Sequence, residues 1–510
     1  MPSRASTRLT HERSPHRTRC SNRVRTLFRQ HTRSFGKLQA RLEALLPLMT
    51  PREVSNVLWA YGALATSGGR APPAPLLRLF RARVEATLPQ FGPLDLANTA
   101  HAFMELGEPV PRGLLEALGA RALALVAEEA RPARAGARPR RQGSFTPESL
   151  TILLRAFASL GLGADAECMR ALFALAEGLM PTFPGPYLAT LLATYRLLDR
   201  RPAEATLDEL TDRLLAQVGA TRMNAVACAM RSYAALGYHP GDRMLQAVQQ
   251  KVARTEYPLG RGEVVGLMYA FGKLEARPAR ATIRKMEQSL RVHVGRANAR
   301  GLAQVLWAYA KMEAWNPPPD LLAAVTDRLL EVAPQLDRIS LPMVMYAYGR
   351  LLYEPGEELL GALHERARAL AGARPTELSL QGIGNILWGF QRLDYAPDAG
   401  LLAGLSDTFL ANLTGGDQVP VAVAQYVDAH AQFGLAPAPE VLQTIDEYLR
   451  AHMDILELSH INAIMSSYQL LGHNPGNQLL EEMRRRIVLK AAENISQGMQ
   501  DRFLAGEVKV

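Results

Sequence analysis

Residues 304–312 read Gln-Val-Leu-Trp-Ala-Tyr-Ala-Lys-Met, and the pattern returns as Asn-Val-Leu-Trp-Ala-Tyr-Gly-Ala-Leu at 56–64 and Asn-Ile-Leu-Trp-Gly-Phe-Gln-Arg-Leu at 385–393. We call the aromatic residue at the sixth position of this pattern the anchor. Six of the ten intervals between successive anchors are 38 or 39 residues, which predicts about eleven repeats of a 38-residue unit. The anchors are Tyr61, Phe103, Phe157, Tyr195, Tyr233, Phe271, Tyr309, Tyr348, Phe390, His430 and Tyr468.

Each repeat contains residues that mark the boundaries of two helices. Proline follows the anchor by seven residues in most repeats, as at Pro202 and Pro475, and we expect it in the first turn of a second helix. Glycine follows many anchors by four residues, as at Gly107 and Gly472, where a left-handed helix end favours it. The predicted fold is therefore all-α, an α-α superhelix or solenoid of about eleven helix-turn-helix repeats.

The helical period divides the first helix of each repeat into three faces. Positions −7, −4, −3, 0 and +3 relative to the anchor are apolar and predict the core, as in Ile383, Ile386, Leu387, Phe390 and Leu393. Positions −1 and +1 are mostly small, so neighbouring first helices can approach closely. Positions −5, −2 and +2 point away from the core and should line one surface, which we expect to be the concave one.

That surface carries amides, aromatic rings and cations. Single-stranded nucleic acid needs stacking surfaces for bases, polar groups for base edges and positive charge for phosphates, so this combination predicts an RNA site. The expected phosphate contacts are Lys273, Lys311, Arg350 and Arg392, and the expected stacking residues are Tyr269, Trp307, Tyr346, Trp388 and Trp59. The amides that complete the predicted RNA site are Asn56, Asn98, Gln304, Asn385 and Gln425.

Packing alone offers a competing explanation of the same residues. A tryptophan between two helices can serve as a wedge that fills their interface, and an amide can bridge neighbouring backbones. Lysine and arginine near a helix C-terminus are also favoured by the helix dipole without any ligand. The occurrence of all three residue types in consecutive repeats, with a cation in each of four, favours RNA.

The net charge of +9 is concentrated in the N-terminal segment. Residues 1–36 contain nine arginines and a single acidic residue, Glu12, and no apolar stretch typical of a secretory signal. We expect an organellar transit peptide, with the mitochondrial matrix favoured and the chloroplast as the alternative; a basic arm retained on the mature protein is the other interpretation. The predicted solenoid covers 37–490, with a basic loop inserted near 130–143, and 491–510 form a C-terminal tail.

The repeat resembles the octotricopeptide repeats of green-algal organellar proteins and the related repeats of RAP-domain proteins. The resemblance rests on 56–64, 304–312 and 385–393, and on the period. Pro317, Pro318, Pro319, Asp320 and Leu321 only approximate the family's Pro-Pro-Pro-Glu-Trp turn, and no RAP-like α/β module is expected after the last repeat. Members of the family are RNA binders that act in transcript stability, processing or translation, and some are structural subunits of mitochondrial ribosomes.

The resemblance therefore implies a non-catalytic organellar RNA-binding protein. A mitochondrial-ribosome subunit that holds rRNA fragments and neighbouring proteins is one alternative, and a scaffold that binds only proteins is the other. No strand precedes the glycines near 260–266, and the histidines and three cysteines show no metal-ligand spacing. We therefore expect no catalytic residue, metal, cofactor or small-molecule substrate, and no membrane-spanning segment, because no apolar run reaches 18 residues.

Overall fold

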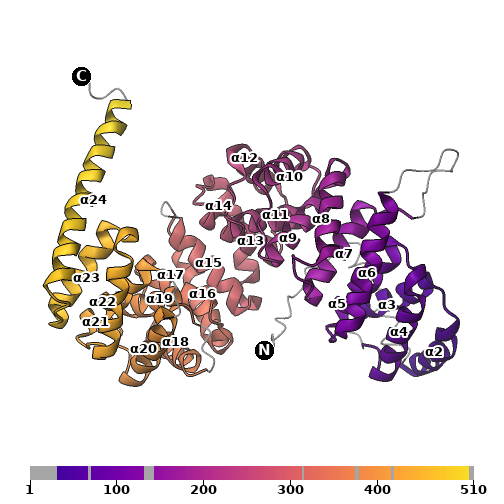
Figure 1. The fold of residues 1–510 in the computed structure, drawn as a ribbon, viewed down its shortest axis with the longest axis horizontal. Coiled ribbons are helices and arrows are strands. Elements are labelled where there is room, and N and C mark those ends of the chain that lie inside the picture. Colours follow the sequence, from indigo (N-terminus) through magenta and orange to yellow (C-terminus); the bar gives the residue numbers. More distant parts are fainter. Residues whose placement is uncertain are drawn as a thin grey trace. The chain divides into compact units, whose positions relative to one another are not determined.

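The computed structural model describes residues 32–66, 71–130, 143–312, 315–373, 378–414 and 419–504, and all regular structure within them is helical. The described residues form 23 α-helices, and most of the connections between them are short (Figure 1). They pack against their neighbours as a helical solenoid requires, so the all-α prediction is confirmed. The chain divides into two compact units, Met1–Ala270 and Phe271–Val510.

The odd-numbered helices carry the anchors and form the first layer. In the first unit α3 packs on α5, α5 on α7, α7 on α9 and α9 on α11, and in the second unit the same succession runs from α15 to α23. The bounds are α3 Pro51–Thr66, α5 Pro93–Leu106, α7 Pro147–Leu160, α9 Gly185–Leu197, α11 Met223–Ala235, α13 Arg261–Lys273, α15 Ala299–Lys311, α17 Ser340–Leu351, α19 Leu380–Arg392, α21 Pro420–Phe433 and α23 Leu458–Leu471.

The even-numbered helices form the second layer, and six of them end in a single 3-10 turn. Second-layer helices also pack on one another, for example α16 on α18 and α18 on α20. Their bounds are α2 Thr32–Leu45, α4 Ala74–Thr87, α6 Arg112–Glu129, α8 Glu167–Leu179, α10 Glu204–Gln217, α12 Gly241–Arg254, α14 Arg280–His293, α16 Pro319–Val332, α18 Glu357–Ala371, α20 Ala399–Thr414, α22 Pro439–Ala451 and α24 Asn477–Leu504.

The predicted core face of the first-layer helices is buried. All eleven anchors are buried, and so are the apolar residues at the other four core positions of α11 and α19. Burying a large aromatic side chain contributes about 1.5–3 kcal/mol, so the anchors are a main source of the cohesion between the layers.

The prolines lie slightly earlier than we expected. Pro202, Pro278, Pro355 and Pro475 each precede the first residue of a second-layer helix by two positions, so they stand outside the first turn. All four are buried. The ring therefore fills the corner between the two helices and ends the connection, while the fixed φ of proline directs the chain into the next helix.

In nine of the eleven repeats the residue four positions after the anchor adopts a left-handed conformation. Gly107 and Gly472 both have φ of 66°, which confirms the glycine prediction. The same position is left-handed where glycine is absent, as at Leu352 with φ of 50° and Asp394 with φ of 52°. The geometry of the turn is thus imposed by the repeat, and non-glycine residues there carry backbone strain.

Small residues allow the first-layer backbones to approach closely, as predicted. A Cβ added to Gly62 would lie 3.2 Å from the Cα of Ala102, and one added to Gly389 would lie 2.6 Å from the carbonyl oxygen of Met345. Real side chains do not approach this closely, so a glycine at position 389 is required by the contact between α17 and α19.

Tyrosine anchors also bind the second-layer helix that precedes them. The Tyr233 hydroxyl lies 3.0 Å from the Thr211 hydroxyl oxygen, and the Tyr468 hydroxyl donates to Asp446 at 2.7 Å. Tyr348 meets Thr326 at 2.9 Å, again 22 residues earlier in the chain. Burial raises the pKa of these tyrosines, so the hydroxyls remain protonated and link one repeat to the next.

A second set of bonds ties seven of the second-layer helices to the connection in front of their own first helix. These loop-bridging hydrogen bonds satisfy carbonyl groups that the helix ends leave open. The donor and acceptor are separated by 30–34 residues in every case. The pairs are Arg83 with Met49, Arg121 with Phe91, Gln217 with Phe183, Lys251 with Gly219, Arg328 with Ala297, Arg366 with Leu336 and Asn412 with Leu378.

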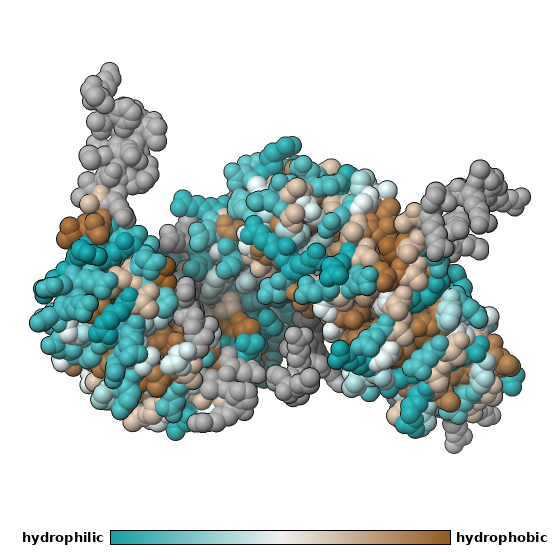
Figure 2. All heavy atoms as spheres, viewed as in Figure 1, coloured by the Kyte–Doolittle hydropathy of each residue, from teal (hydrophilic) through white to brown (hydrophobic). Residues whose placement is uncertain are grey.

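The structure describes only part of the segments that we predicted outside the repeats. The arginine-rich residues 1–31 and the basic loop at 131–142 lie outside the described residues. At the other end α24 continues to Leu504, through the segment that we assigned to a tail. Val488 and Leu489 of α24 are exposed, and Figure 2 shows hydrophobic residues at the surface of this helix.

Candidate nucleic-acid interface

The predicted phosphate contacts occupy the same place in four successive first-layer helices. Lys273, Lys311, Arg350 and Arg392 each lie in the last turn of their helix, on α13, α15, α17 and α19. All four belong to the second unit. Together with Trp307, Tyr346 and Trp388 they form what we call the cation-aromatic row.

Capping side chains fix where these helices begin. The Asn298 side chain accepts a hydrogen bond from the Gly301 amide at 2.9 Å at the start of α15, and Ser379 accepts from the Gly382 amide at 3.1 Å at the start of α19. Such caps stabilise a helix by about 1 kcal/mol. Since the helix begins at a fixed residue, the −2 and +2 positions face the same side in each repeat.

Cations and rings of the row contact one another across three helices. The Lys311 ammonium lies 5.8 Å from the Trp307 ring centre and 5.3 Å from that of Tyr346, so it bridges α15 and α17. The rings of Tyr346 and Trp388 stack with centres 5.6 Å apart, and the Arg392 guanidinium lies 6.0 Å from the Trp388 ring centre. Cation-π contacts of this kind hold the charged groups beside the rings.

Trp388 is also seated against its neighbour helix. A Cβ on Gly349 would lie 3.0 Å from the Trp388 ring and 3.2 Å from the Cβ of Arg392. The ring therefore packs on the backbone of α17, as the wedge interpretation expects, and it is half-buried. Lys273, Arg350 and Arg392 remain exposed at the surface.

The predicted amides differ in their accessibility. Gln381 donates from Nε2 to Asn385 Oδ1 at 2.9 Å and lies 3.0 Å from Gln425 Oε1, so these three amides form a bridge between α19 and α21. Gln304 is only 6% exposed. The bridging interpretation therefore applies to Asn385 and Gln425, and both residues are half-exposed.

The other predicted residues lie in the first unit. Trp59 on α3 is 41% exposed, and Asn56, one turn earlier on the same helix, is exposed. Asn98 is half-buried on α5, where His101 and Glu105 lie within 3.7 Å of each other. Tyr269 is half-buried on α13, one turn before Lys273.

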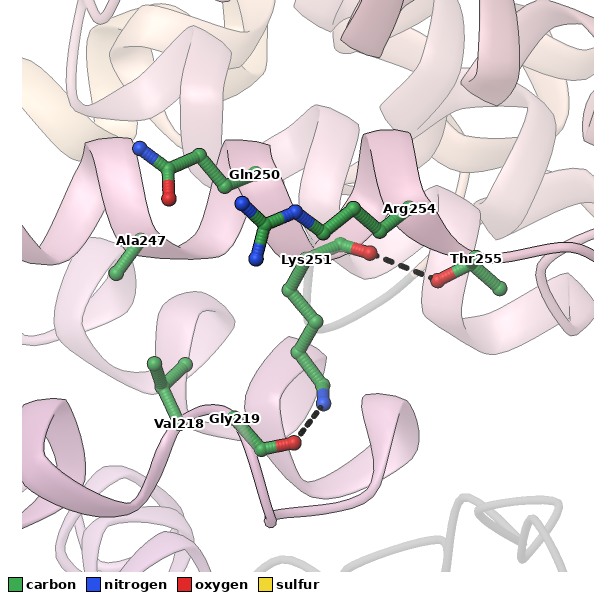
Figure 3. Close-up of a pocket in the computed structure, with 7 residues that line it drawn as sticks. All are labelled: Val218, Gly219, Ala247, Gln250, Lys251, Arg254 and Thr255. Carbon is green, nitrogen blue, oxygen red and sulfur yellow. Dashed lines mark hydrogen bonds between the residues drawn. The ribbon is translucent and has the colours of Figure 1, made fainter.

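A cavity of about 330 Å³ lies beside α12 in the first unit. Figure 3 shows Lys251 reaching across it to the Gly219 carbonyl, and Arg254 turned over the same space. The Lys251 ammonium lies 2.8 Å from that oxygen, and burial lowers the pKa of Lys251 below its ordinary value. The cavity is therefore the surroundings of one loop-bridging hydrogen bond, and its lysine is already engaged.

Sequence reasoning missed the loop-bridging bonds and the tyrosine hydroxyl partners. The sequence does contain a signal for the tyrosine hydroxyl partners, because a polar residue stands 22 positions before Tyr233, Tyr309, Tyr348 and Tyr468. Among the described residues no group of three histidines, cysteines or acids is placed to hold a metal ion. None of the helices in that part of the chain is long and apolar enough to span a membrane.

No protein-family model matches this chain, and no curated protein has a matching sequence.

Proposed function

We propose that the protein is a non-catalytic RNA-binding solenoid of 38-residue repeats, related to the octotricopeptide class, that holds single-stranded or ribosomal RNA against the cation-aromatic row. The observation that carries the proposal is the row itself: four cations in register on four successive helices, with rings between them. Phosphates would contact the exposed cations, and bases would stack on the rings of the row. Such a protein would support RNA stability, processing or translation.

The organelle in this proposal is the mitochondrion, with the matrix as the compartment. The support is compositional: nine arginines against one acid in residues 1–36. A subunit of the mitochondrial ribosome, in contact with rRNA fragments and ribosomal proteins, would use the same row. The two forms of the proposal differ in whether the native protein sediments with ribosomal subunits after nuclease treatment at moderate salt.

One observation favours a second candidate, a scaffold that binds only proteins. The Trp388 ring already contacts the Tyr346 ring and the backbone of α17 at Gly349. A row whose rings serve mainly to pack helices could present its cations to an acidic protein partner instead of RNA.

The test replaces Lys273, Lys311, Arg350 and Arg392 with glutamine together. For single-stranded RNA we expect the slope of log affinity against log salt to fall by roughly 3, at about 0.7 for each phosphate that is no longer neutralised. A matched variant replaces four exposed arginines of the first unit, Arg52, Arg78, Arg222 and Arg243, with glutamine. It removes the same charge, so it reports what bulk electrostatics alone would change.

If the row variant is folded and binds RNA with the affinity and slope of the unmodified protein, the row is not the RNA site. Retained RNA binding together with failure to bind a protein partner would instead support the scaffold.

A further inference from the structure

Helix α14 and the segment before it carry a concentration of positive charge that lies outside the row. Residues 274–300 contain seven lysines and arginines and only two acids, Glu275 and Glu287. We propose that this surface, defined by Arg277, Arg280 and Arg284, is a second RNA contact that binds backbone phosphates without reading bases. The inference rests on the proposed RNA-binding function and adds a site that lies on the second layer.

Arg280 and Arg284 lie on one side of α14, because four residues at about 100° each complete roughly one helical turn, and Arg277 lies three residues before the helix, in the connection that leads into it. All three are exposed, and none forms an ion pair within the part of the chain that the structure describes. Arg291, seven residues after Arg284 on α14, donates two hydrogen bonds to the Asp320 carboxylate, from Nε at 3.0 Å and from Nη2 at 3.1 Å. The uncompensated charge is therefore at the N-terminal half of α14.

The acid on this helix is turned toward the core. Glu287 is half-buried and accepts a hydrogen bond from the Tyr309 hydroxyl at 3.3 Å, and burial raises its pKa above the ordinary value. It therefore compensates the arginines less than an exposed carboxylate would. A cation at the N-terminus of a helix is opposed by the helix dipole, so structural stability does not account for Arg280 and Arg284 at this end.

The chemistry of the surface selects phosphates. Helix α14 has no phenylalanine, tyrosine or tryptophan, and its one imidazole, His293, lies nine residues after Arg284 at the other end of the helix, so the arginines have no ring beside them on α14 on which a base could stack. Arginine binds phosphate through two parallel N–H groups, and phosphate contacts carry no base sequence. The surface should therefore accept double-stranded RNA, whose bases are closed to the cation-aromatic row.

The apolar face of α14 argues against an anionic membrane as the partner. Ile283, Met286 and Leu290 are buried in the protein core. A helix that lies on a membrane must insert an apolar face, and this one has none to spare apart from the single exposed Val292.

The test uses the full chain and an RNA duplex of about 16 base pairs, which has no unpaired bases. Replacing Arg277, Arg280 and Arg284 with glutamine should lower the salt slope of duplex binding by about 2 to 3, at 0.7–0.9 per phosphate. The glutamine variant of Arg52, Arg78 and Arg222 is the matched control and should bind the duplex as the unmodified protein does. Circular dichroism confirms that both variants are folded.

The outcomes separate this surface from the row. Duplex binding that survives in the row variant and disappears in the α14 variant supports the inference. Duplex binding that is unchanged in the α14 variant overturns it, even if the row proves to bind single strands. Absence of binding to either RNA by the unmodified protein refutes the proposed function as well, and binding only to anionic vesicles would assign the arginines to a membrane surface.

Discussion

Gly389 offers the sharpest test of how the first-layer helices pack. A Cβ at this position would lie 2.6 Å from the Met345 carbonyl oxygen and 2.8 Å from the Met345 Cβ, whereas non-bonded contacts are comfortable at about 3.5–4.0 Å. Alanine gains about 1 kcal/mol in helix propensity over glycine, and overpacking costs roughly 1–3 kcal/mol. The overpacking cost minus the propensity gain is therefore at most about 2 kcal/mol. The obstructing atoms include backbone, which cannot rotate away, so we expect Gly389→Ala to lower the free energy of unfolding by this full amount of about 2 kcal/mol.

The measurement is urea unfolding followed by circular dichroism, with hydrogen exchange to locate the effect. Exchange should accelerate in α17 and α19, because both must shift to admit the methyl group. Gly361→Ala, in the interior of α18, is the matched control, since nothing lies within 4 Å of the added Cβ. It should raise stability by about 0.5–1 kcal/mol. Equal responses of the two glycines would refute the close approach of α17 and α19.

Substitutions at three further positions test other features. Tyr233→Ala should lower the free energy of unfolding by about 3–5 kcal/mol, with faster hydrogen exchange confined to adjacent repeats. Tyr233→Phe should lower it by about 1 kcal/mol, because only the hydrogen bond to Thr211 is lost. Faster exchange along the whole chain would contradict this expectation. Leu352→Gly should raise the unfolding free energy by up to about 1 kcal/mol, because Leu352 is left-handed and 63% exposed; a lower melting temperature would argue against the strain. Burial lowers the pKa of His430, so the unfolded state binds its proton first and stability is lost as pH falls below about 6.5; His430→Phe should lose that part of the pH dependence in urea titrations.

The core of the first layer could be predicted because a single rule determines it. Apolar residues at helical spacing around an aromatic anchor must face inward, and Ile383, Ile386 and Leu387 are buried as that rule requires. Glycine at the helix end was predictable for the same reason, since only its backbone is free at positive φ. Leu352 and Asp394 show the limit of this reasoning, because the turn keeps its shape when the expected residue is missing.

The row itself was predicted as a set of residues on one face, but its internal contacts were not. Whether Trp388 presents its ring to solvent or packs on α17 depends on Gly349 in the preceding repeat, which leaves room for the ring. The amide bridge of Gln381, Asn385 and Gln425 likewise depends on a neighbour that becomes adjacent only after the helices stack. Pattern identifies the face, and the contact between repeats decides which atoms remain available.

The two kinds of hydrogen bond in this fold act at different levels of its cooperativity. A loop-bridging bond closes a repeat upon itself and sets how stable that repeat is alone, whereas a tyrosine hydroxyl bond couples a repeat to the one before it. Phe390 has no hydroxyl, so the coupling between α18 and α19 rests on ring contacts such as that with His364, at 6.2 Å between ring centres. Cohesion at this junction therefore comes from side-chain packing, including the close contact of α17 with α19, whereas the junctions at Tyr233, Tyr348 and Tyr468 each add a buried hydrogen bond to the packing.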